Sequence, residues 1–240
     1  MLCLLLPGMV SAWQDPLSGS EEAAAVSLAL SDKLNNRAEN TTGTSGSANT
    51  VAIKARPALQ ARQAIASADN TSSAITLGRE VLLVELLYQK QKKSSASESV
   101  QQRIAEVFLF DYASGKTSRY EIDVNTNDVL REQAVASPHL PLNDREQSAA
   151  VSMLVNDASA FAAISSEYQR HFGQALQGTD NIDMKVLVWQ PPAANTSTAA
   201  SDCRTQRCAL ISVFTNNNFS FSVEPVVNLM TQNVYTGVIR

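Results

Sequence analysis

At 240 residues, of which 44% are hydrophobic, the chain is long enough to bury either one large core or two small ones. Its formal net charge is −4, and no long run of Lys or Arg supplies the electrostatic footprint that binding to a polyanion requires. We therefore expect no nucleic-acid partner.

The chain opens with an apolar stretch, Leu2–Val10, followed by small residues, Ser11 and Ala12. This order is typical of a signal peptidase site, so residues 1–12 are interpreted as a partial signal peptide and the protein as secreted or periplasmic. A signal should also begin with Lys or Arg, whereas the first such residue is Lys33, and a short buried N-terminal strand or helix is the alternative. The stretch is shorter than the ~20 residues of a membrane span, so no span is expected once the signal is removed.

Removal of this signal also removes Cys3 and leaves one cysteine pair, Cys203 and Cys208. In an oxidising compartment we expect this pair to form a disulfide. By the loop-entropy relation a ring this small contributes roughly 2 kcal/mol at most, so it would pin a loop. Half of a metal site is the alternative, but zinc needs four ligands and only His139 and His171 remain as nitrogen donors. We expect neither a metal nor a cofactor.

An internal repeat organises the chain, because residues 16–32 align with residues 141–157 at an offset of 125. Each copy opens with Pro-Leu and then has a capping residue followed by Glu at the third position, the spacing of a capping box. These residues are Ser18 and Glu21 in the first copy and Asn143 and Glu146 in the second. Each copy is therefore predicted to start with a helix.

Apolar residues recur along both predicted helices at the spacing of an amphipathic stripe. The first stripe contains Val26, Leu30 and Leu34, and the second contains Val151, Leu154, Val155, Ala158 and Ala162. After the first helix, residues 35–50 are polar and rich in Gly, Ser, Thr and Asn, which predicts a flexible insertion.

The predicted strands repeat as well, since Gln102-Arg103 precedes one apolar run and Gln206-Arg207 another, at an offset of 104. The matched runs are 104–110 with 208–214, 118–124 with 219–224, and 80–88 with 184–190. Residues 80–88 are rich in Leu, so a helix is the alternative there. Turns are expected at 113–116 and 216–218, and polar loops at 90–99 and 191–202. Strict alternation in 118–124 indicates an antiparallel sheet with one wet face.

These patterns predict an α+β protein with two tandem modules, residues 13–137 and 138–240. In each module one helix covers an antiparallel sheet of three or four strands. The order resembles the N2 and N3 domains of copper amine oxidases, which are cystatin-like modules in tandem. The resemblance is carried by Asp15-Pro16-Leu17 with Glu21, Leu140-Pro141-Leu142 with Glu146, and the strand starts at Arg103 and Arg207. Residues 120–129 also resemble a PepSY strand and turn.

The chemistry of that family does not follow from the resemblance. Its enzymes form a quinone from a Tyr that follows Asn and hold copper with three His. None of the five Tyr residues here follows Asn, and the chain has two His. We therefore expect no amine oxidase site and no enzyme activity, in keeping with the non-catalytic role that the resemblance implies.

Three further motifs have bland interpretations. Gly115-Lys116-Thr117 lacks the first Gly of a phosphate-binding loop and is interpreted as a hairpin turn. Residues 123–128 alternate oxygen side chains like a calcium loop, but Asp128 replaces its Gly and Ala134 its closing Glu, which favours a strand-end turn. Tyr88 and Trp189 occupy equivalent strand ends, where core packing is favoured over a ligand platform.

The functional expectation is a non-catalytic exported protein whose modules bind an unknown protein or small molecule. One alternative is the accessory N-terminal half of an amine oxidase-like enzyme whose catalytic part is missing or separate. Another is an inhibitor or chaperone role, for which no specific residue is apparent.

Overall fold

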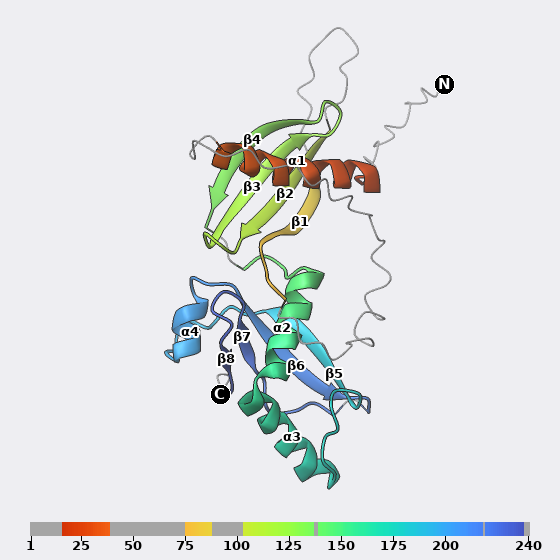
Figure 1. The fold of residues 1–240 in the computed structure, drawn as a ribbon, viewed down its shortest axis with the longest axis vertical. Coiled ribbons are helices and arrows are strands. Elements are labelled where there is room, and N and C mark those ends of the chain that lie inside the picture. The colour runs from red at the N-terminus through yellow and green to blue at the C-terminus, as the bar shows by residue number, and fades with distance from the viewer. Residues whose placement is uncertain (1–15, 39–74, 88–102, 137–138, 218, 238–240) are drawn as a thin grey trace, which may run out of the picture.

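The computed structural model describes residues 16–38, 75–87, 103–136, 139–217 and 219–237 (Figure 1). Within them lie four helices and two antiparallel sheets, ordered β1-β2-β3-β4 and β5-β6-β7-β8. The protein is therefore of the α+β class. The predicted signal, Tyr88 and most of the predicted insertion lie outside the described residues, and the boundary at 137/138 stays a prediction.

The first sheet contains β1 (Arg79–Leu87), β2 (Ile104–Asp111), β3 (Lys116–Asp123) and β4 (Asp128–Val135). Residues 79–87 form a strand, not a helix, because they pair with β2 from Arg79 to Leu87, with one irregularity at Leu82. Such pairing overrides the helix propensity of Leu. β2 and β3 pair in register from Ile104 opposite Asp123 to Asp111 opposite Lys116, as the alternating pattern predicted.

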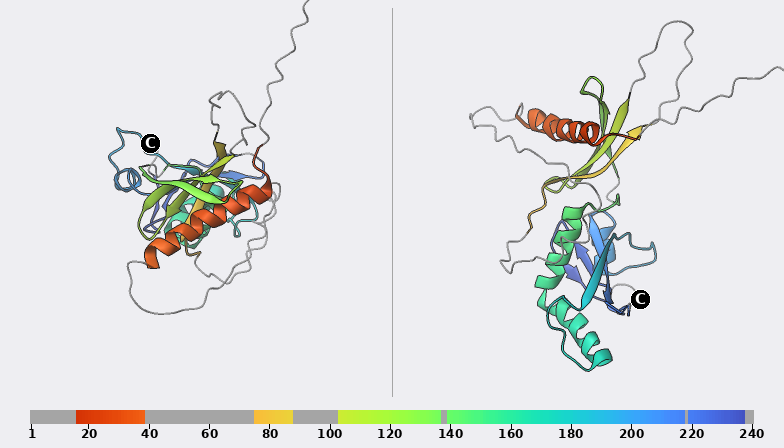
Figure 2. Two further views of the ribbon diagram at one scale, coloured as in Figure 1. Left: turned by 90° about the horizontal axis from the view of Figure 1, so that it is seen from above. Right: turned by 90° about the vertical axis from the view of Figure 1, so that its right-hand side faces the viewer.

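Helix α1 (Gly19–Ala38) crosses one face of this sheet, as the left-hand view of Figure 2 shows. Of the predicted stripe, Leu30 is partly buried and packs against the core of this module, while the fully buried helix residues are Ala25 and Ala29. Small side chains let the helix lie close to the sheet, and the larger residues flank the contact. Ala25 and Ala29 lie in one core with the apolar strand residues Ala105, Val107, Leu109, Tyr120 and Ile122. The predicted insertion was also wrong at its start, since α1 continues through residues 35–38.

The second helical region is two helices rather than the one predicted. α2 (Asp144–Asn156) and α3 (Ala158–Phe172) meet at Asp157 with a bend of 79°. The Asp157 carboxylate accepts hydrogen bonds from the backbone N–H groups of Ser159 and Ala160, so it caps the second helix. Ala158 and Ala162 are exposed, and Ala160 and Ile164 take their place in the core.

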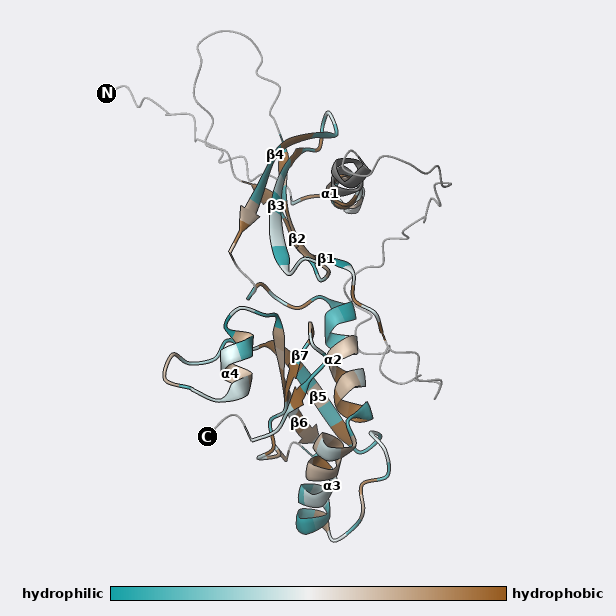
Figure 3. Cartoon of the chain, turned by 60° about the vertical axis from the view of Figure 1, so that its left-hand side comes forward, coloured by the Kyte–Doolittle hydropathy of each residue, from teal (hydrophilic) through white to brown (hydrophobic). Residues whose placement is uncertain are grey.

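The second sheet contains β5 (Ile182–Val188), β6 (Cys208–Thr215), β7 (Val226–Asn228) and β8 (Val234–Tyr235). The strand predicted at 219–224 was wrong, because that segment makes only one isolated bridge, Phe214 with Ser220. Pro225 follows it and has no N–H to donate to a ladder, so regular pairing resumes only at Val226. Figure 3 shows hydrophobic residues along β6 and β7, and a hydrophilic stretch in the middle of β4.

The polar loop predicted at 191–202 was wrong in its second half, where α4 (Thr198–Cys203) forms. Ser197 caps it, since its hydroxyl accepts a hydrogen bond from the Ala200 N–H. Trp189 packs here in a small core with Cys203, Cys208 and Val226, and it is 5% exposed. Core packing is therefore its role in the structure.

The two sheets lie at opposite ends of the molecule, and the linker before α2 runs between them (Figures 1 and 2). Among the described residues no single helix has the length and hydrophobicity of a membrane span. Only α2 and α3 taken together, across their bend, have the length and hydrophobicity of such a span.

Candidate functional site

Each module contains the same arrangement of an arginine, a glutamate and a proline carbonyl. In the first module, Ser18 and Glu21 complete the predicted capping box, since the Ser18 N–H donates to the Glu21 carboxylate at 2.7 Å. Arg103 Nε donates to the same carboxylate at 2.8 Å, and Arg103 Nη2 donates to the Pro16 carbonyl at 3.2 Å. We call these three residues the first clamp. They tie the start of α1 to the start of β2.

The second clamp consists of Glu146, Arg207 and Pro141, at the predicted repeat positions. Asn143 and Glu146 form the capping box, and Arg207 donates to both Glu146 oxygens at 2.5 and 2.8 Å. Arg207 also donates to the carbonyls of Pro141 at 2.6 Å and Leu140 at 2.8 Å. The sequence placed both arginines at strand starts without predicting either ion pair.

The two clamps differ in burial. The side chains of Arg103 and Glu21 are 23% and 24% exposed, whereas those of Arg207 and Glu146 are both 0% exposed. Hydrogen bonding from Arg103, and next from the Ser18 backbone, lowers the pKa of Glu21 to about 2. The first clamp is thus a partly solvated ion pair and the second a desolvated one.

Residues of the first module cover the second clamp. The Arg207 guanidinium lies 5.7 Å from the centre of the Phe110 ring, and the Tyr112 hydroxyl donates to Glu146 Oε1 at 2.7 Å. Burial raises the pKa of Tyr112, and the Glu146 carboxylate raises it further, so the phenol stays protonated and keeps donating.

A second set of polar contacts lies beside this pair. Glu80 of β1, only 3% exposed, accepts a hydrogen bond from Asn143 Nδ2 at 3.2 Å and pairs with Arg145 at 3.2 Å. Asn143 Nδ2 also donates to the Val81 carbonyl at 3.1 Å. We call Glu80, Tyr112, Asn143, Arg145, Glu146 and Arg207 the junction network. Because its members come from both modules, it links them directly.

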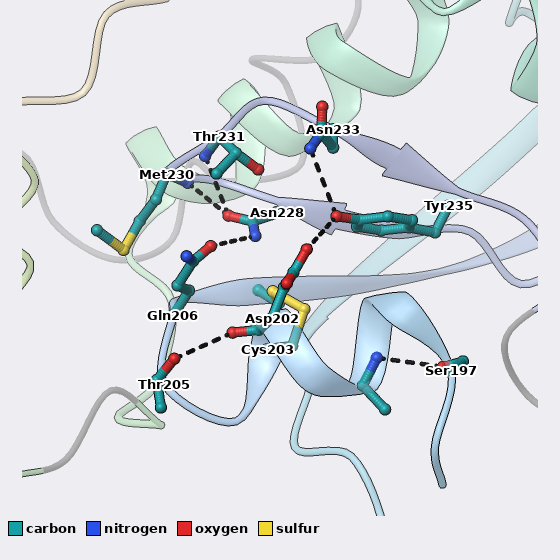
Figure 4. Close-up of a disulfide and its surroundings, with 12 residues drawn as sticks. Ser197, Asp202, Cys203, Thr205, Gln206, Asn228, Met230, Thr231, Asn233 and Tyr235 are labelled. Carbon is teal, nitrogen blue, oxygen red and sulfur yellow. Dashed lines mark hydrogen bonds between the residues drawn. A yellow bond between two sulfur atoms is a disulfide. The ribbon is translucent and has the colours of Figure 1, made fainter.

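The disulfide joins the end of α4 to the residue that directly follows Arg207. Cys203 and Cys208 are bonded with their Cα atoms 5.6 Å apart, and both are fully buried. Figure 4 shows the ring between α4 and β6, where Gln206 accepts a hydrogen bond from Asn228 at 2.5 Å. Arg207 belongs to this ring, so the disulfide restrains the backbone that carries the second clamp.

The turn predicted at 113–116 is present, whereas the turn predicted at 216–218 lies partly outside the described residues. Gly115 has φ 65° in the β2–β3 hairpin, a conformation that favours glycine, and a Cβ there would lie 3.0 Å from the Met230 side chain. Asp123 accepts from the backbone N–H groups of Asn125 and Thr126, and Asn228 accepts from Met230 and Thr231 in the same way. Both are strand-end turns.

The two histidines have different surroundings. The Nδ1 atom of His139 is buried and has no hydrogen-bond partner among the described residues; burial lowers the pKa of His139, and Arg207 lowers it further. His171 lies at the end of α3 with its ring centre 4.5 Å from that of Phe219. The part of the chain that the structure describes contains no group of three or more His, Cys, Asp or Glu placed to hold a metal.

Two buried carboxylates were not anticipated from the sequence. Glu167 of α3 accepts hydrogen bonds from the backbone N–H groups of Ser222 and Val223 at 2.8 and 3.1 Å, which satisfies the irregular segment before Pro225. Glu106 pairs with Arg119 on the face of the first sheet opposite α1. Burial raises the pKa of Glu106, and a hydrogen bond with Glu85 raises it further. Charged residues that alternate with apolar ones along a strand are expected on the solvent-exposed face of a sheet, so nothing in the sequence indicated that Glu106 is buried.

No protein-family model and no curated protein matches this sequence. Among solved structures, the chain is similar to a copper-containing benzylamine oxidase from Hansenula polymorpha, with a TM-score of 0.42 and 12% identity. The match covers 69% of this chain and 27% of the oxidase chain. The class that the described residues define is an α+β protein with four helices and two four-stranded antiparallel sheets.

The junction network holds the carbonyls of the linker and the Glu146 carboxylate in place by hydrogen bonds. The donors of Arg207 point at two carbonyls and a carboxylate, and the Tyr112 hydroxyl points at that same carboxylate. These contacts fix the linker before α2 and set it against the end of β2.

Proposed function

We propose that this chain is a non-catalytic, exported tandem-module protein that acts as one binding unit, with two cystatin-like modules of the N2/N3 type held in a fixed relative orientation. The observation that carries the proposal is the fully buried Glu146–Arg207 pair beneath Phe110 and Tyr112. A desolvated ion pair is tolerated only where its geometry is held closely. A joint of this kind suits a protein whose partner contacts both modules.

Partner capture tests this proposal. The full oxidised chain is immobilised and exposed to the extracellular or periplasmic fraction of its source, beside a Tyr112→Phe variant that loses one bond of the junction network. We expect a retained protein or small molecule to bind the wild type more tightly than this variant. Tyr168→Phe, a substitution in the core of the second module, is the matched control. Equal retention by all three proteins, or none by the wild type, would count against the proposal.

The non-catalytic part has its own assay. The similar structure is a benzylamine oxidase, so the purified chain is incubated with Cu²⁺ and benzylamine and hydrogen peroxide is measured. We expect no peroxide above a protein-free blank. Peroxide release proportional to protein concentration would refute the proposal.

A second candidate is the accessory N-terminal half of an amine oxidase-like enzyme. It is favoured by the finding that the Pro, Glu and Arg residues carrying the sequence resemblance are those that build both clamps. Sequencing downstream of Arg240 and across neighbouring genes tests it. An oxidase catalytic domain in either place would support this candidate, and its absence from both would end it.

A further inference from the structure

The sheets expose four terminal strands within the described residues, and these strands are not alike. β1 and β4 each contain a register irregularity, at Leu82 and at Leu130, and β8 has two residues. β5 pairs with β6 without a shift over seven residues. Bulges and short length protect a sheet edge from pairing with another chain. By this criterion β5 is the unprotected edge.

The hydrogen-bond phase of β5 follows from one contact. Trp189 N donates to the Cys208 carbonyl, and these residues are directly opposite each other in the β5–β6 register. Alternation in an antiparallel pair then directs the odd-numbered residues of β5 toward β6. The backbone N–H and C=O groups of Met184, Val186 and Val188 therefore point outward from the sheet edge, where no other described strand pairs with them.

The side chains on the solvent side of β5 are exposed: Asp183, Lys185 and Leu187, of which Leu187 is 57% exposed. Two of them, Asp183 and Lys185, carry opposite charges. The Lys185 ammonium lies 5.4 Å from the centre of the Phe214 ring, which keeps its charge on this face. An isolated charge on an edge strand opposes pairing with another strand. Asp183 and Lys185 are two residues apart, so a twofold axis between two copies of the chain can place each of them opposite the oppositely charged residue of the other copy.

We propose that two copies of the chain pair antiparallel through β5, on a twofold axis at Met184, so that their second sheets join into one. In this register Asp183 lies opposite the partner's Lys185, and Lys185 opposite the partner's Asp183. Both pairs occupy non-hydrogen-bonded positions, where opposing Cα atoms are about 4.5 Å apart. A shift of the axis to Lys185 would place the two lysines opposite each other. Charge complementarity therefore selects the register, independently of the proposed binding function.

Sedimentation equilibrium on the full oxidised chain tests this dimer. We expect a concentration-dependent monomer–dimer equilibrium for the wild type. Asp183→Lys and Lys185→Asp should each raise the dissociation constant about tenfold, because each replaces two attractive contacts with two repulsive ones. The double variant Asp183→Lys/Lys185→Asp should return it to near the wild-type value. Asp128→Lys, the same charge change on the exposed start of β4, should leave it unchanged.

The substituted side chains are exposed, so none of these variants should impair folding, and far-ultraviolet circular dichroism verifies this. A wild type that stays monomeric at all concentrations overturns the proposal. So does a dimer that single charge changes leave intact, and so does a double variant that fails to recover.

Discussion

The two clamps contain the same residue types at the same repeat positions, yet one is partly solvated and the other is sealed. Glu21 and Arg103 keep about a quarter of their side-chain surface, while Glu146 and Arg207 keep none. The local sequence motif therefore does not explain why the second clamp is buried and the first is not. Phe110 and Tyr112, contributed by the other module, make the difference.

Burial changes what such a pair does for the fold. A solvated pair adds little net stability, because water screens the attraction and the side chains lose freedom. A desolvated pair also adds little over an apolar replacement, but losing one partner strands a charge in the interior. The same motif is thus optional in the first module and obligatory in the second.

The sharpest test of this comparison removes each arginine in turn. Arg207→Ala should lower the free energy of unfolding by about 3–5 kcal/mol, because it leaves the Glu146 carboxylate buried without its cation. Arg103→Ala should cost about 1 kcal/mol or less, since water can solvate Glu21. Urea denaturation of both variants measures the difference. Equal losses would mean that burial does not distinguish the clamps.

Removing the disulfide sharpens the comparison, because the first clamp has no such ring. Cys203→Ala with Cys208→Ala should cost about 2 kcal/mol from the added freedom of the unfolded loop. When it is combined with Arg207→Ala, the total loss should be smaller than the sum of the two, since both changes loosen one loop. Urea unfolding of the three variants supplies this cycle, with reduced wild type as the control. Strict additivity would show that the ring and the clamp act separately.

The capping residues differ in the same direction. Asn143→Ala should cost about 1.5 kcal/mol, because the side chain caps α2 and also donates to Glu80 and Val81. Ser18→Ala should cost about 0.5 kcal/mol, because its hydroxyl lies 3.3 Å from the Glu21 N–H at an exposed helix start. Thermal unfolding followed by circular dichroism measures both changes. A larger loss for Ser18→Ala would contradict the assigned role of the junction network.

Local patterns predicted much of each module because local chemistry determines those features. The capping boxes and the β2–β3 hairpin depend on neighbours in sequence, and both are present. The strands predicted at 80–88 and 184–190 form as β1 (79–87) and β5 (182–188), but β1 depends on its long-range pairing with β2. The errors arose where one residue interrupts a longer pattern. Asp157 breaks an apolar stripe that continues past it, and Pro225 interrupts a strand that its counterpart in the first module completes.

The junction network could not be read from periodicity. Arg103 and Arg207 stood out as matched strand starts, but no spacing rule places Phe110 over one of them and not the other. That contact depends on how the modules sit against each other, which is a tertiary property. A weak signal existed in Tyr112, a large polar-tipped residue just after a strand, because a buried Tyr hydroxyl usually finds a partner.

The smallest expected effect concerns acid, and it tests whether the first clamp is an ion pair at all. The pKa of Glu21 is lowered to about 2 in the folded protein, so the clamp stabilises the fold above pH ~4.5 and loses that contribution as the pH falls toward 2. Glu21→Gln should therefore be less stable than the wild type at pH 7, by about 1 kcal/mol or less, and the difference should disappear as the pH falls below 2. Urea unfolding across this range measures the convergence, with the exposed Glu22→Gln as control. A carboxyl nuclear magnetic resonance titration that places Glu21 near 4.5 would show that Arg103 does not hold it, and the two clamps would then differ in kind as well as in burial.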